Sequence, residues 1–189
     1  MQDSWRGTWK FDGGVLANQA SHHVDLLQWL IGNIKSVFVK TLKITKKTNA
    51  ADTCLAILKF KSGALGSIEA TTATRPKDLE GSISILGENG TAVISGFAVS
   101  KIETWEFKKR KKADTDIFKY SSNYKDVYGF GHIEFYKNVY NFLHNKKNSA
   151  TALEEGSKSV KIIDKIYSSA EISKEVFFND NNYSKKLGK

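Results

Sequence analysis

The chain has little cysteine, proline or methionine, with one residue of each among its 189 residues. The single cysteine, Cys54, excludes an intrachain disulfide and fits a reducing compartment, so we expect a cytoplasmic protein. Because Cys54 lies in a strand-like segment, we interpret it as a buried thiol and not as a nucleophile. No apolar run approaches the ~20 residues of a membrane span. The start, MQDSWRGTWK, is polar and aromatic, unlike a secretory signal.

Acidic residues are fewer than basic ones, with 20 Asp and Glu against 29 Lys and Arg. The formal net charge is therefore +9, and the pI is about 9.5. A positive field could attract a polyanion or an anionic small substrate such as a phosphorylated or nucleotide sugar. The densest basic run is Lys108 to Lys112, but the other lysines are spread from Lys10 to Lys189 and no aromatic residues interleave with the run. We therefore expect a solvated loop there, with a polyanion-binding module as the weaker alternative.

The potential chemistry is concentrated in Gly13 to Leu30, where the pattern predicts one helix of about five turns. Asn18, His22 and Asp25 then share a narrow face with Trp29. The opposite face carries aliphatic residues for burial, namely Leu16, Ala20, Leu27 and Ile31. Such a polar face is either plainly solvated or lines a site, and the large Trp29 side chain on it favours a site.

An imidazole is the side chain best suited to moving protons near neutral pH, so His22 is the candidate base. Asp25, one turn later, could fix the tautomer of His22. His23 points to the apolar side and is interpreted as a packed structural histidine. Successive helical residues diverge by about 100°, so the two histidines cannot chelate one ion, and we expect no metal site. Gly13 and Gly14 would let the backbone approach another group closely, such as a ligand.

Two further segments allow two interpretations each. Trp5, Arg6 and Trp9 could form a segment across the edge of the core, the wall of a pocket, or both. Arg75 lies in a loop, Thr71 to Pro76, between two predicted strands. It could bind a carboxylate or phosphate in bidentate fashion, or simply be solvated.

The rest of the chain predicts antiparallel strands followed by two helices. No strand–glycine loop–helix pattern suggests a dinucleotide site, so we expect no cofactor-binding residues and no tight nicotinamide binding by this chain alone. Strands are expected at 35–45, 52–61, 64–73, 79–86, 91–95 and 100–107, helices at 132–145 and from a capping box at 151–154, a closing strand at 176–178, and a disordered basic tail at 179–189. The last helix should bury Val160, Ile163, Ile166, Tyr167 and Ala170.

This order of elements, with GGVLANQASHHVDLLQWLIG near the start, resembles the C-terminal domain of the Gfo/Idh/MocA oxidoreductases. Gly13-Gly14, Asn18, His22 and Asp25 match the family's glycine pair, acidic or amide residue, histidine and aspartate. The resemblance extends over nearly the whole chain and implies an α+β fold, with a largely antiparallel mixed sheet and helices packed on one face, as in the C-terminal domain of glyceraldehyde-3-phosphate dehydrogenase. Residues 1–178 would form the substrate-binding and oligomerisation domain.

Asn18 departs from the family's commoner aspartate. Together with the N-terminal SWRGTW and the Thr-Arg-Pro loop, it is similar to the UDP-N-acetylglucosaminuronate dehydrogenases of lipopolysaccharide and surface-polysaccharide biosynthesis. The resemblance implies that His22 transfers the proton and that Asn18 hydrogen-bonds the reacting sugar. It makes substrate-binding candidates of Arg6, Trp9, Gln19, Asp25, Arg75, His132 and Tyr136.

The resemblance also implies NAD or NADP as cofactor in a full-length enzyme, and the family's N-terminal dinucleotide-binding domain has no counterpart here. We therefore expect an isolated domain that is inactive alone, whether as an expressed piece or through a split reading frame. Leu55 and Ile57 add apolar residues to the second face of their strand, which indicates a homo-oligomer through the open sheet face. The alternative is a non-enzymatic self-association domain. Neither a membrane nor a nucleic acid is expected as partner.

Overall fold

A computed structural model describes residues 5–46, 48–96, 99–121, 131–147 and 153–189. It divides the chain into two compact units, residues 1–78 with 153–189 (unit 1) and residues 79–152 (unit 2), and each is described by itself. Within the described residues, no helix has the length and apolar character needed to cross a membrane.

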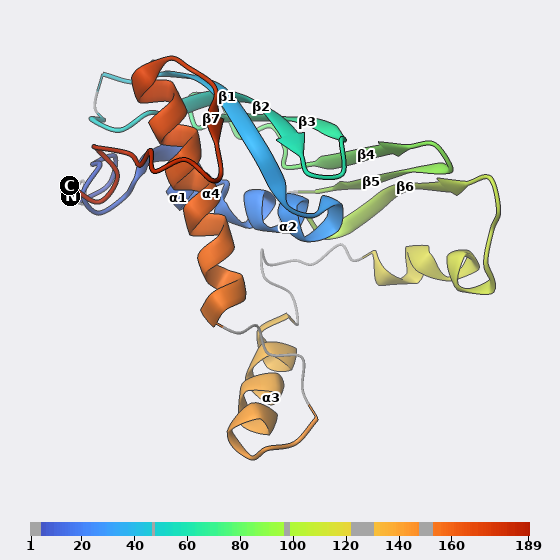
Figure 1. Ribbon diagram of the computed structural model, residues 1–189. Coiled ribbons are helices and arrows are strands. Elements are labelled where there is room, and N and C mark those ends of the chain that lie inside the picture. Colours follow the sequence, from blue (N-terminus) through green and yellow to red (C-terminus); the bar gives the residue numbers. More distant parts are fainter. Residues whose placement is uncertain (1–4, 47, 97–98, 122–130, 148–152) are drawn as a thin grey trace. The chain divides into compact units, whose positions relative to one another are not determined.

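Unit 1 is a four-stranded antiparallel sheet with helices packed on one face (Figure 1). The strand order is β3-β2-β1-β7, and each printed pairing is antiparallel. The elements are α1 (Gly14–Asn18), α2 (Ser21–Ile31), β1 (Ile34–Leu42), β2 (Thr53–Phe60), β3 (Leu65–Thr71), α4 (Leu153–Ile172) and β7 (Val176–Phe177). This arrangement confirms the predicted α+β class and the short closing strand.

Alternation along β2 places the core of unit 1. Its inward side chains are all buried: Cys54, Ala56, Leu58 and Phe60. Leu55 and Ile57 point to the other face and are 55% and 58% exposed. The inward residues pack with Leu16 of α1, Val24 of α2 and Ile166 and Tyr167 of α4. A pleated strand that is apolar on both faces thus leaves one apolar face outside.

Unit 2 contains a second antiparallel sheet of order β4-β5-β6. Its strands are β4 (Ile83–Gly87), β5 (Gly90–Ser95) and β6 (Lys101–Phe107), followed by two 3₁₀ turns, Lys112–Thr115 and Ile117–Tyr120, and by α3 (Gly131–Leu143). The hairpin around residues 87–90 is as predicted. The described strands of the chain thus fall into two sheets instead of one.

The predicted five-turn helix is instead two helices, α1 and α2, with Gln19 and Ala20 between them. The amides of Gln19 and Ala20 both donate to the Val15 carbonyl, at 3.1 and 2.9 Å, which closes α1. A new ladder starts when the Val24 amide donates to the Ala20 carbonyl at 3.0 Å. The opposite face remains as predicted, because Leu16 and Ala20 are buried and Leu27 and Ile31 pack against the core.

Val160 does not belong to the buried stripe of α4, contrary to the prediction, because it is 61% exposed. The first turns of α4 run past the sheet, and burial begins at Ile162 (Figure 1). Ile163, Ile166 and Tyr167 are buried and Ala170 is partly buried, as predicted. Thr151 and Ala152 of the predicted capping box lie outside the described residues.

The basic tail was expected to be disordered, but the structure places residues 179–189 against α4 and the N-terminal turn. Lys165 donates to two tail carbonyls, and Leu187 packs against the core. The prediction of disorder rested on the polar composition and terminal position of the segment. The partners of its polar groups are α4 side chains and the Trp9 carbonyl, which no local pattern reveals.

Candidate functional site

A hollow of about 160 Å³ lies in unit 1, where the N-terminal turn, α1 and the β1–β2 connection meet. Most of its lining residues are polar or glycine. Three of the predicted site residues, Arg6, Asn18 and Gln19, are among them. The other lining residues are Gly7, Asp12, Gly14, Val15, Thr48, Ala50, Ala51, Asp52 and Thr72.

The glycine pair at the start of α1 allows a close backbone approach beside this hollow. Gly14 has a φ of 73°, and a Cβ there would lie 2.6 Å from the Ala51 carbonyl oxygen. The Val15 amide donates to the same carbonyl at 2.9 Å. Only glycine fits this backbone-to-backbone approach. The close approach predicted for Gly13 and Gly14 is therefore confirmed, and the partner of Gly14 is the chain itself.

The hydroxyl of Tyr167 supports α1 from below by accepting a hydrogen bond from the Leu16 amide at 3.2 Å. Burial raises the pKa of Tyr167 above its usual range, so the group stays a neutral phenol. Trp9 packs edge-on against the same ring, with centroids 5.0 Å apart. Trp9 is thus part of the core edge and not of the hollow's lining, whereas Arg6 lines it. Both interpretations of the N-terminal segment hold, for different residues.

Asn18 is held by its neighbours in one orientation. Its amide Nδ2 donates to Asp12 Oδ1, and its Oδ1 accepts a hydrogen bond from Gln19 Nε2 at 3.1 Å. The second oxygen of Asp12 accepts the Gly7 amide at 2.8 Å. A primary amide has two N–H donors and two oxygen lone pairs. One donor and one lone pair of Asn18 therefore remain for a ligand at the hollow.

Asp52 is buried on the floor of the hollow, where it organises the β1–β2 connection. Its carboxylate accepts the amides of Ile44 and Thr45 at 2.9 and 2.6 Å and the Thr53 hydroxyl at 3.1 Å. Burial alone would raise the pKa of Asp52. The hydrogen bonds outweigh burial and hold the pKa below its usual range. Asp52 is therefore an ionised structural carboxylate.

His22 and Asp25 are exposed on α2 and do not line the hollow. No hydrogen bond joins the two side chains, although both are among the described residues. His23 lies beside His22, with ring centroids 5.6 Å apart, and both its ring nitrogens are buried without a partner. Burial, and next the neighbouring His22, lower the pKa of His23. His23 is thus a packed histidine, as predicted, and His22 is the accessible one.

Arg75 lies at the end of the loop that leaves β3. Its guanidinium Nη1 donates to the carbonyls of Thr72 and Thr74, at 3.3 and 2.5 Å. Thr72 lines the hollow, and its amide donates to the Asp52 carbonyl at 2.9 Å. Arg75 itself is exposed and outside the lining, so it is tied to the wall without forming part of it.

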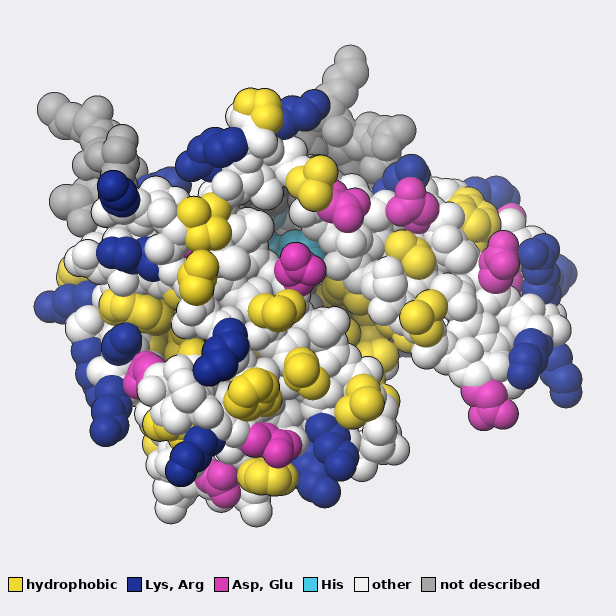
Figure 2. Space-filling view, turned by 90° about the horizontal axis from the view of Figure 1, so that it is seen from above, with side chains coloured by type: hydrophobic (Ala, Val, Ile, Leu, Met, Phe, Trp, Pro, Cys, Tyr) yellow, Lys and Arg dark blue, Asp and Glu magenta, His cyan; other side chains and the backbone are white. Residues whose placement is uncertain are grey.

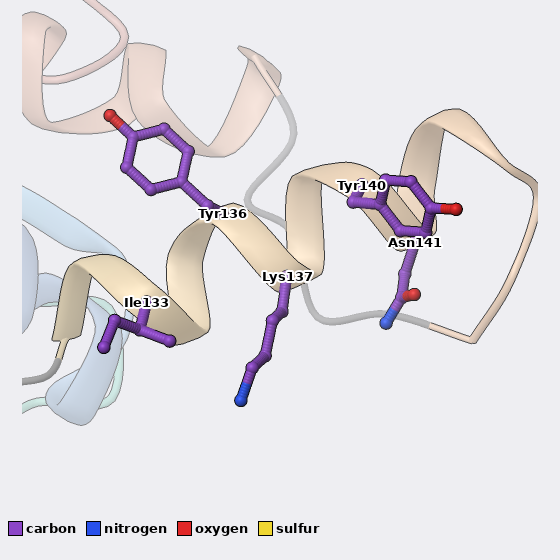
Figure 3. Close-up of a pocket in the computed structure, with 5 residues that line it drawn as sticks. All are labelled: Ile133, Tyr136, Lys137, Tyr140 and Asn141. Atoms are coloured by element: carbon purple, nitrogen blue, oxygen red, sulfur yellow. The ribbon is translucent and has the colours of Figure 1, made fainter.

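The remaining predicted residues, His132 and Tyr136, belong to α3 in unit 2 and are exposed. A wide hollow on α3 is lined by Ile133, Tyr136, Lys137, Tyr140 and Asn141. In Figure 3 the Tyr136 and Lys137 side chains point away from each other. All five lining residues come from one helix that buries no side chain, so no second element closes this hollow. It is a weaker site candidate than the hollow of unit 1.

Other sequence features do not add to the site. The run Lys108 to Lys112 is exposed, as predicted. On the face shown in Figure 2, basic side chains are distributed among hydrophobic and acidic ones. Burial raises the pKa of the Cys54 thiol to about 12, so it is a buried thiol and not a nucleophile. No group of three or more metal-ligand side chains occurs among the described residues.

Sequence reasoning missed four lining residues that organise the hollow: Asp12, Thr48, Asp52 and Thr72. Asp12 could have been found, because it directly precedes the glycine pair and lies six residues before Asn18. The other three lie in the β1–β2 connection or at the end of β3. They approach α1 only through the register of the sheet, which no local pattern contains.

Comparison with known proteins gives the setting of this site. The sequence profile of the oxidoreductase family's C-terminal alpha/beta domain matches residues 1–177. No curated protein sequence matches the chain. The WlbA dehydrogenase from Bordetella pertussis, solved with NADH and UDP-GlcNAcA, is 42% identical with a TM-score of 0.86 over 92% of this chain. WlbA from Chromobacterium violaceum, solved with the same two compounds, is 42% identical with a TM-score of 0.85 over 95% of the chain.

The chain spans 50% of the length of each of these two solved structures. A levoglucosan dehydrogenase solved with NADH has 18% identity and a TM-score of 0.75, over 94% of this chain and 54% of its own. That level of identity shows a shared fold alone.

Proposed function

Because this chain belongs to the Gfo/Idh/MocA oxidoreductase family, as its C-terminal α/β domain, we propose that it is the substrate half of an NAD-dependent dehydrogenase acting on a UDP-N-acetylhexosaminuronate. One observation carries the proposal. The hollow holds an oriented amide and an arginine, Asn18 and Arg6, in a chain 42% identical to two dehydrogenases that were solved with UDP-GlcNAcA.

The residues at the hollow suit an anionic sugar. The Arg6 guanidinium carries a permanent positive charge and can bind a carboxylate or phosphate in bidentate fashion. The unused donor and lone pair of Asn18 can hydrogen-bond a sugar hydroxyl and fix its orientation. Asp12 and Gln19 hold that amide in place, so little rotamer freedom is lost when a ligand binds.

His22 is the proposed base for the reacting hydroxyl. An alcohol must lose its proton as its carbon gives up a hydride, and a positioned base contributes about 10²–10⁴-fold to such a step. His22 is exposed and adjacent in sequence to the α1–α2 break, two residues after Ala20. His23, with its nitrogens buried, has no access to a substrate.

The described part of the chain contains no strand-to-helix glycine loop suited to a pyrophosphate. We therefore assign cofactor binding to residues outside this chain. NAD or NADP, bound in the complete enzyme, would supply the hydride acceptor. We expect this chain alone to be inactive and to bind NADH weakly. We further propose a cytoplasmic role in lipopolysaccharide or surface-polysaccharide synthesis, as the sequence resemblance implies.

A histidine pair provides the test. In a complete enzyme in which this chain replaces the matching half of the Bordetella pertussis dehydrogenase, His22→Asn should lower kcat with UDP-GlcNAcA about 10²-fold or more and leave NADH affinity nearly unchanged. His23→Asn is the matched control and should alter stability more than kcat. Asn18→Ala should raise KM and lower kcat. Near-normal turnover of His22→Asn, with loss in His23→Asn, would refute the assignment.

The second candidate is self-association, which the open face of the unit 1 sheet favours. Leu42, Leu55, Ile57 and Leu65 are each more than half exposed on β1 to β3. Soluble monomers rarely leave such a face in water, and a second copy is the simplest cover. Light scattering should detect oligomers of the chain that Ile57→Lys disrupts and Lys59→Ala does not. An association without any UDP-GlcNAcA binding would favour a non-enzymatic self-association domain.

A further inference from the structure

The C-terminal segment 179–189 is tied to α4 by a buried lysine. Lys165 is 5% exposed, and its Nζ donates to the carbonyls of Asp180 and Asn182, both at 2.6 Å. The same Nζ lies 4.3 Å from the centroid of the Tyr183 ring. A buried ammonium needs such partners, because an uncompensated charge inside a protein is costly. Lys165 therefore fixes the first half of the segment.

Two carboxylates of α4 fix the second half. Glu171 accepts the Ser184 hydroxyl at 2.5 Å and the Lys185 amide at 2.8 Å, one on each oxygen. Asp164 accepts the Ser184 amide at 3.1 Å. Ser184 Oγ in turn accepts the Leu187 amide at 3.0 Å. The segment thus turns back at Ser184 through hydrogen bonds to one helix.

The end of the segment reaches the N-terminal turn. The Gly188 amide donates to the Trp9 carbonyl at 3.0 Å. Leu187 packs so closely on the glycine pair that a Cβ at Gly13 would lie 2.9 Å from Leu187 Cδ1. Lys186 Nζ lies 5.8 Å from the centroid of the Trp9 ring. Trp9 and Gly13 are therefore contacted from outside by the end of the chain.

These two contacts bracket the residue that orients Asn18. Asp12 lies between Trp9 and Gly13 in the sequence, and its carboxylate holds both the Gly7 amide and the Asn18 side chain. The Asp12 and Gly13 amides both donate to the Thr8 carbonyl, at 3.1 and 2.9 Å. The family profile ends at residue 177, so segment 179–189 lies outside the matched region.

We propose that residues 179–189 are a positioning segment for the hollow. By fixing Trp9 and Gly13, the segment sets the place of the Asp12 carboxylate, and through it the orientation of the Asn18 amide. Leu187 and Gly188 are the positioning residues, and Lys165 anchors the segment to α4. The statement that the oriented amide meets a nucleotide sugar rests on the proposed function. The positioning itself is a property of the unliganded chain.

The test uses the full chain with two variants and a control. Leu187→Ser removes the packing on Gly13, and Gly188→Pro removes the N–H that bonds Trp9 and cannot adopt the φ of 76° at this position. Lys185→Ala changes the charge of the same segment and keeps the amide that bonds Glu171. Hydrogen exchange of backbone amides is followed by NMR, and UDP-GlcNAcA binding by calorimetry.

In both variants we expect the Gly7 and Gly13 amides to exchange about tenfold faster or more, because local opening then costs less. The amides of Val37 and Leu58, in the sheet, should keep their rates. UDP-GlcNAcA should bind about three- to tenfold more weakly, the equivalent of about one hydrogen bond. Lys185→Ala should match the unaltered chain in both measurements.

Equal acceleration at Val37 and Leu58 would overturn the proposal, since the segment would then only stabilise unit 1 as a whole. Unchanged exchange at Gly7 and Gly13 would overturn it as well. If Leu187→Ser does not fold, Gly188→Pro decides, because position 188 makes no core contact and a Cβ there would meet nothing within 4 Å. Failure of the unaltered chain to bind UDP-GlcNAcA would refute the proposed function, while the exchange rates would still judge the positioning segment.

Discussion

Unit 1 and unit 2 bury their side chains very differently. Every member of the hydrophobic core cluster belongs to unit 1, from Val15 to Val176. Among the described residues of unit 2, only Ile83, Ala92 and Ser95 are buried, and α3 buries none. Apolar side chains are present in both units, so composition does not explain the contrast. Unit 1 therefore supports its hollow with its own packed core, whereas α3 buries no side chain.

The substitution that should have the greatest effect is at Tyr167, and it tests whether the core of unit 1 supports α1. Tyr167→Ala should lower the free energy of unfolding by about 3–5 kcal/mol, because it removes a fully buried ring and leaves a cavity. It also removes the acceptor of the Leu16 amide. Urea unfolding followed by circular dichroism measures this loss. Tyr136→Ala in α3, where the ring is 67% exposed, should change it by less than about 0.5 kcal/mol. Similar losses of stability in both variants would contradict the difference in burial between the two units.

The next prediction concerns two hydrogen-bonded carboxylates, Asp52 in unit 1 and Asp114 in unit 2. Asp52→Asn in unit 1 should cost about 2–3 kcal/mol, because the buried charge is lost and one acceptor oxygen becomes an NH₂ group that cannot accept a backbone amide. Its lowered pKa adds a pH dependence. The stability from Asp52 is present above its unfolded pKa of about 3.9 and is lost as the pH falls through the folded value.

Asp114 is the counterpart in unit 2, where it accepts the Lys111 amide at 2.5 Å and the Trp105 indole N–H at 3.0 Å. Its surroundings are open to solvent, so Asp114→Asn should cost less than Asp52→Asn. Thermal unfolding at pH 7 and pH 3 gives both comparisons. A larger loss for Asp114→Asn would contradict the contrast between the units.

A smaller effect is expected from two histidines, His23, which is packed in unit 1, and His144, which is exposed in unit 2. The lowered pKa of His23 means that the unfolded state takes up a proton first as the pH falls below about 6.5. Stability should therefore decline from pH 6.5 downward, with a slope of at most about one proton. His23→Leu should flatten this slope. His144→Gln in unit 2, where the ring is exposed, should leave it unchanged in unfolding curves between pH 7 and pH 5.

The smallest effect marks where the packing of unit 1 begins along α4. Val160 is 61% exposed, so Val160→Ala should shift the unfolding free energy by no more than about 0.5 kcal/mol. Ile163→Ala, one turn later at 3% exposure, should cost about 2–5 kcal/mol. Denaturant midpoints of the two variants measure the difference. A loss at Val160 equal to that at Ile163 would extend the core to the start of the helix.

Local patterns located most of the strands and the buried faces of the helices, but the strand expected at 79–86 begins only at Ile83. Alternation located the buried side of β2, and the glycine-containing turns located both hairpins. The break at Gln19-Ala20 could not be found this way, because helical periodicity continues across it. The predicted burial of Val160 was wrong for a related reason. Periodicity gives the direction of a side chain and not the extent of the surface that it packs against.

The site was predicted in part. Asn18 was identified from the helical pattern after the glycine pair, and Arg6 and Gln19 from the family resemblance. These three residues line one hollow. Thr48, Asp52 and Thr72 arrive there through sheet register, so the sequence alone could not assign them. The roles of His22 and of the other predicted residues stay predictions until the variants are measured.

The interruption between α1 and α2 also bears on substitutions at Asn18. In a single long helix, a substitution that shifts Asn18 would also shift His22, the residue one turn later. With the break at Gln19-Ala20, α1 is anchored to the Ala51 carbonyl, while α2 packs mainly on α4. Substitutions around Asn18 can therefore change the lining of the hollow without moving the imidazole of His22 on the second helix.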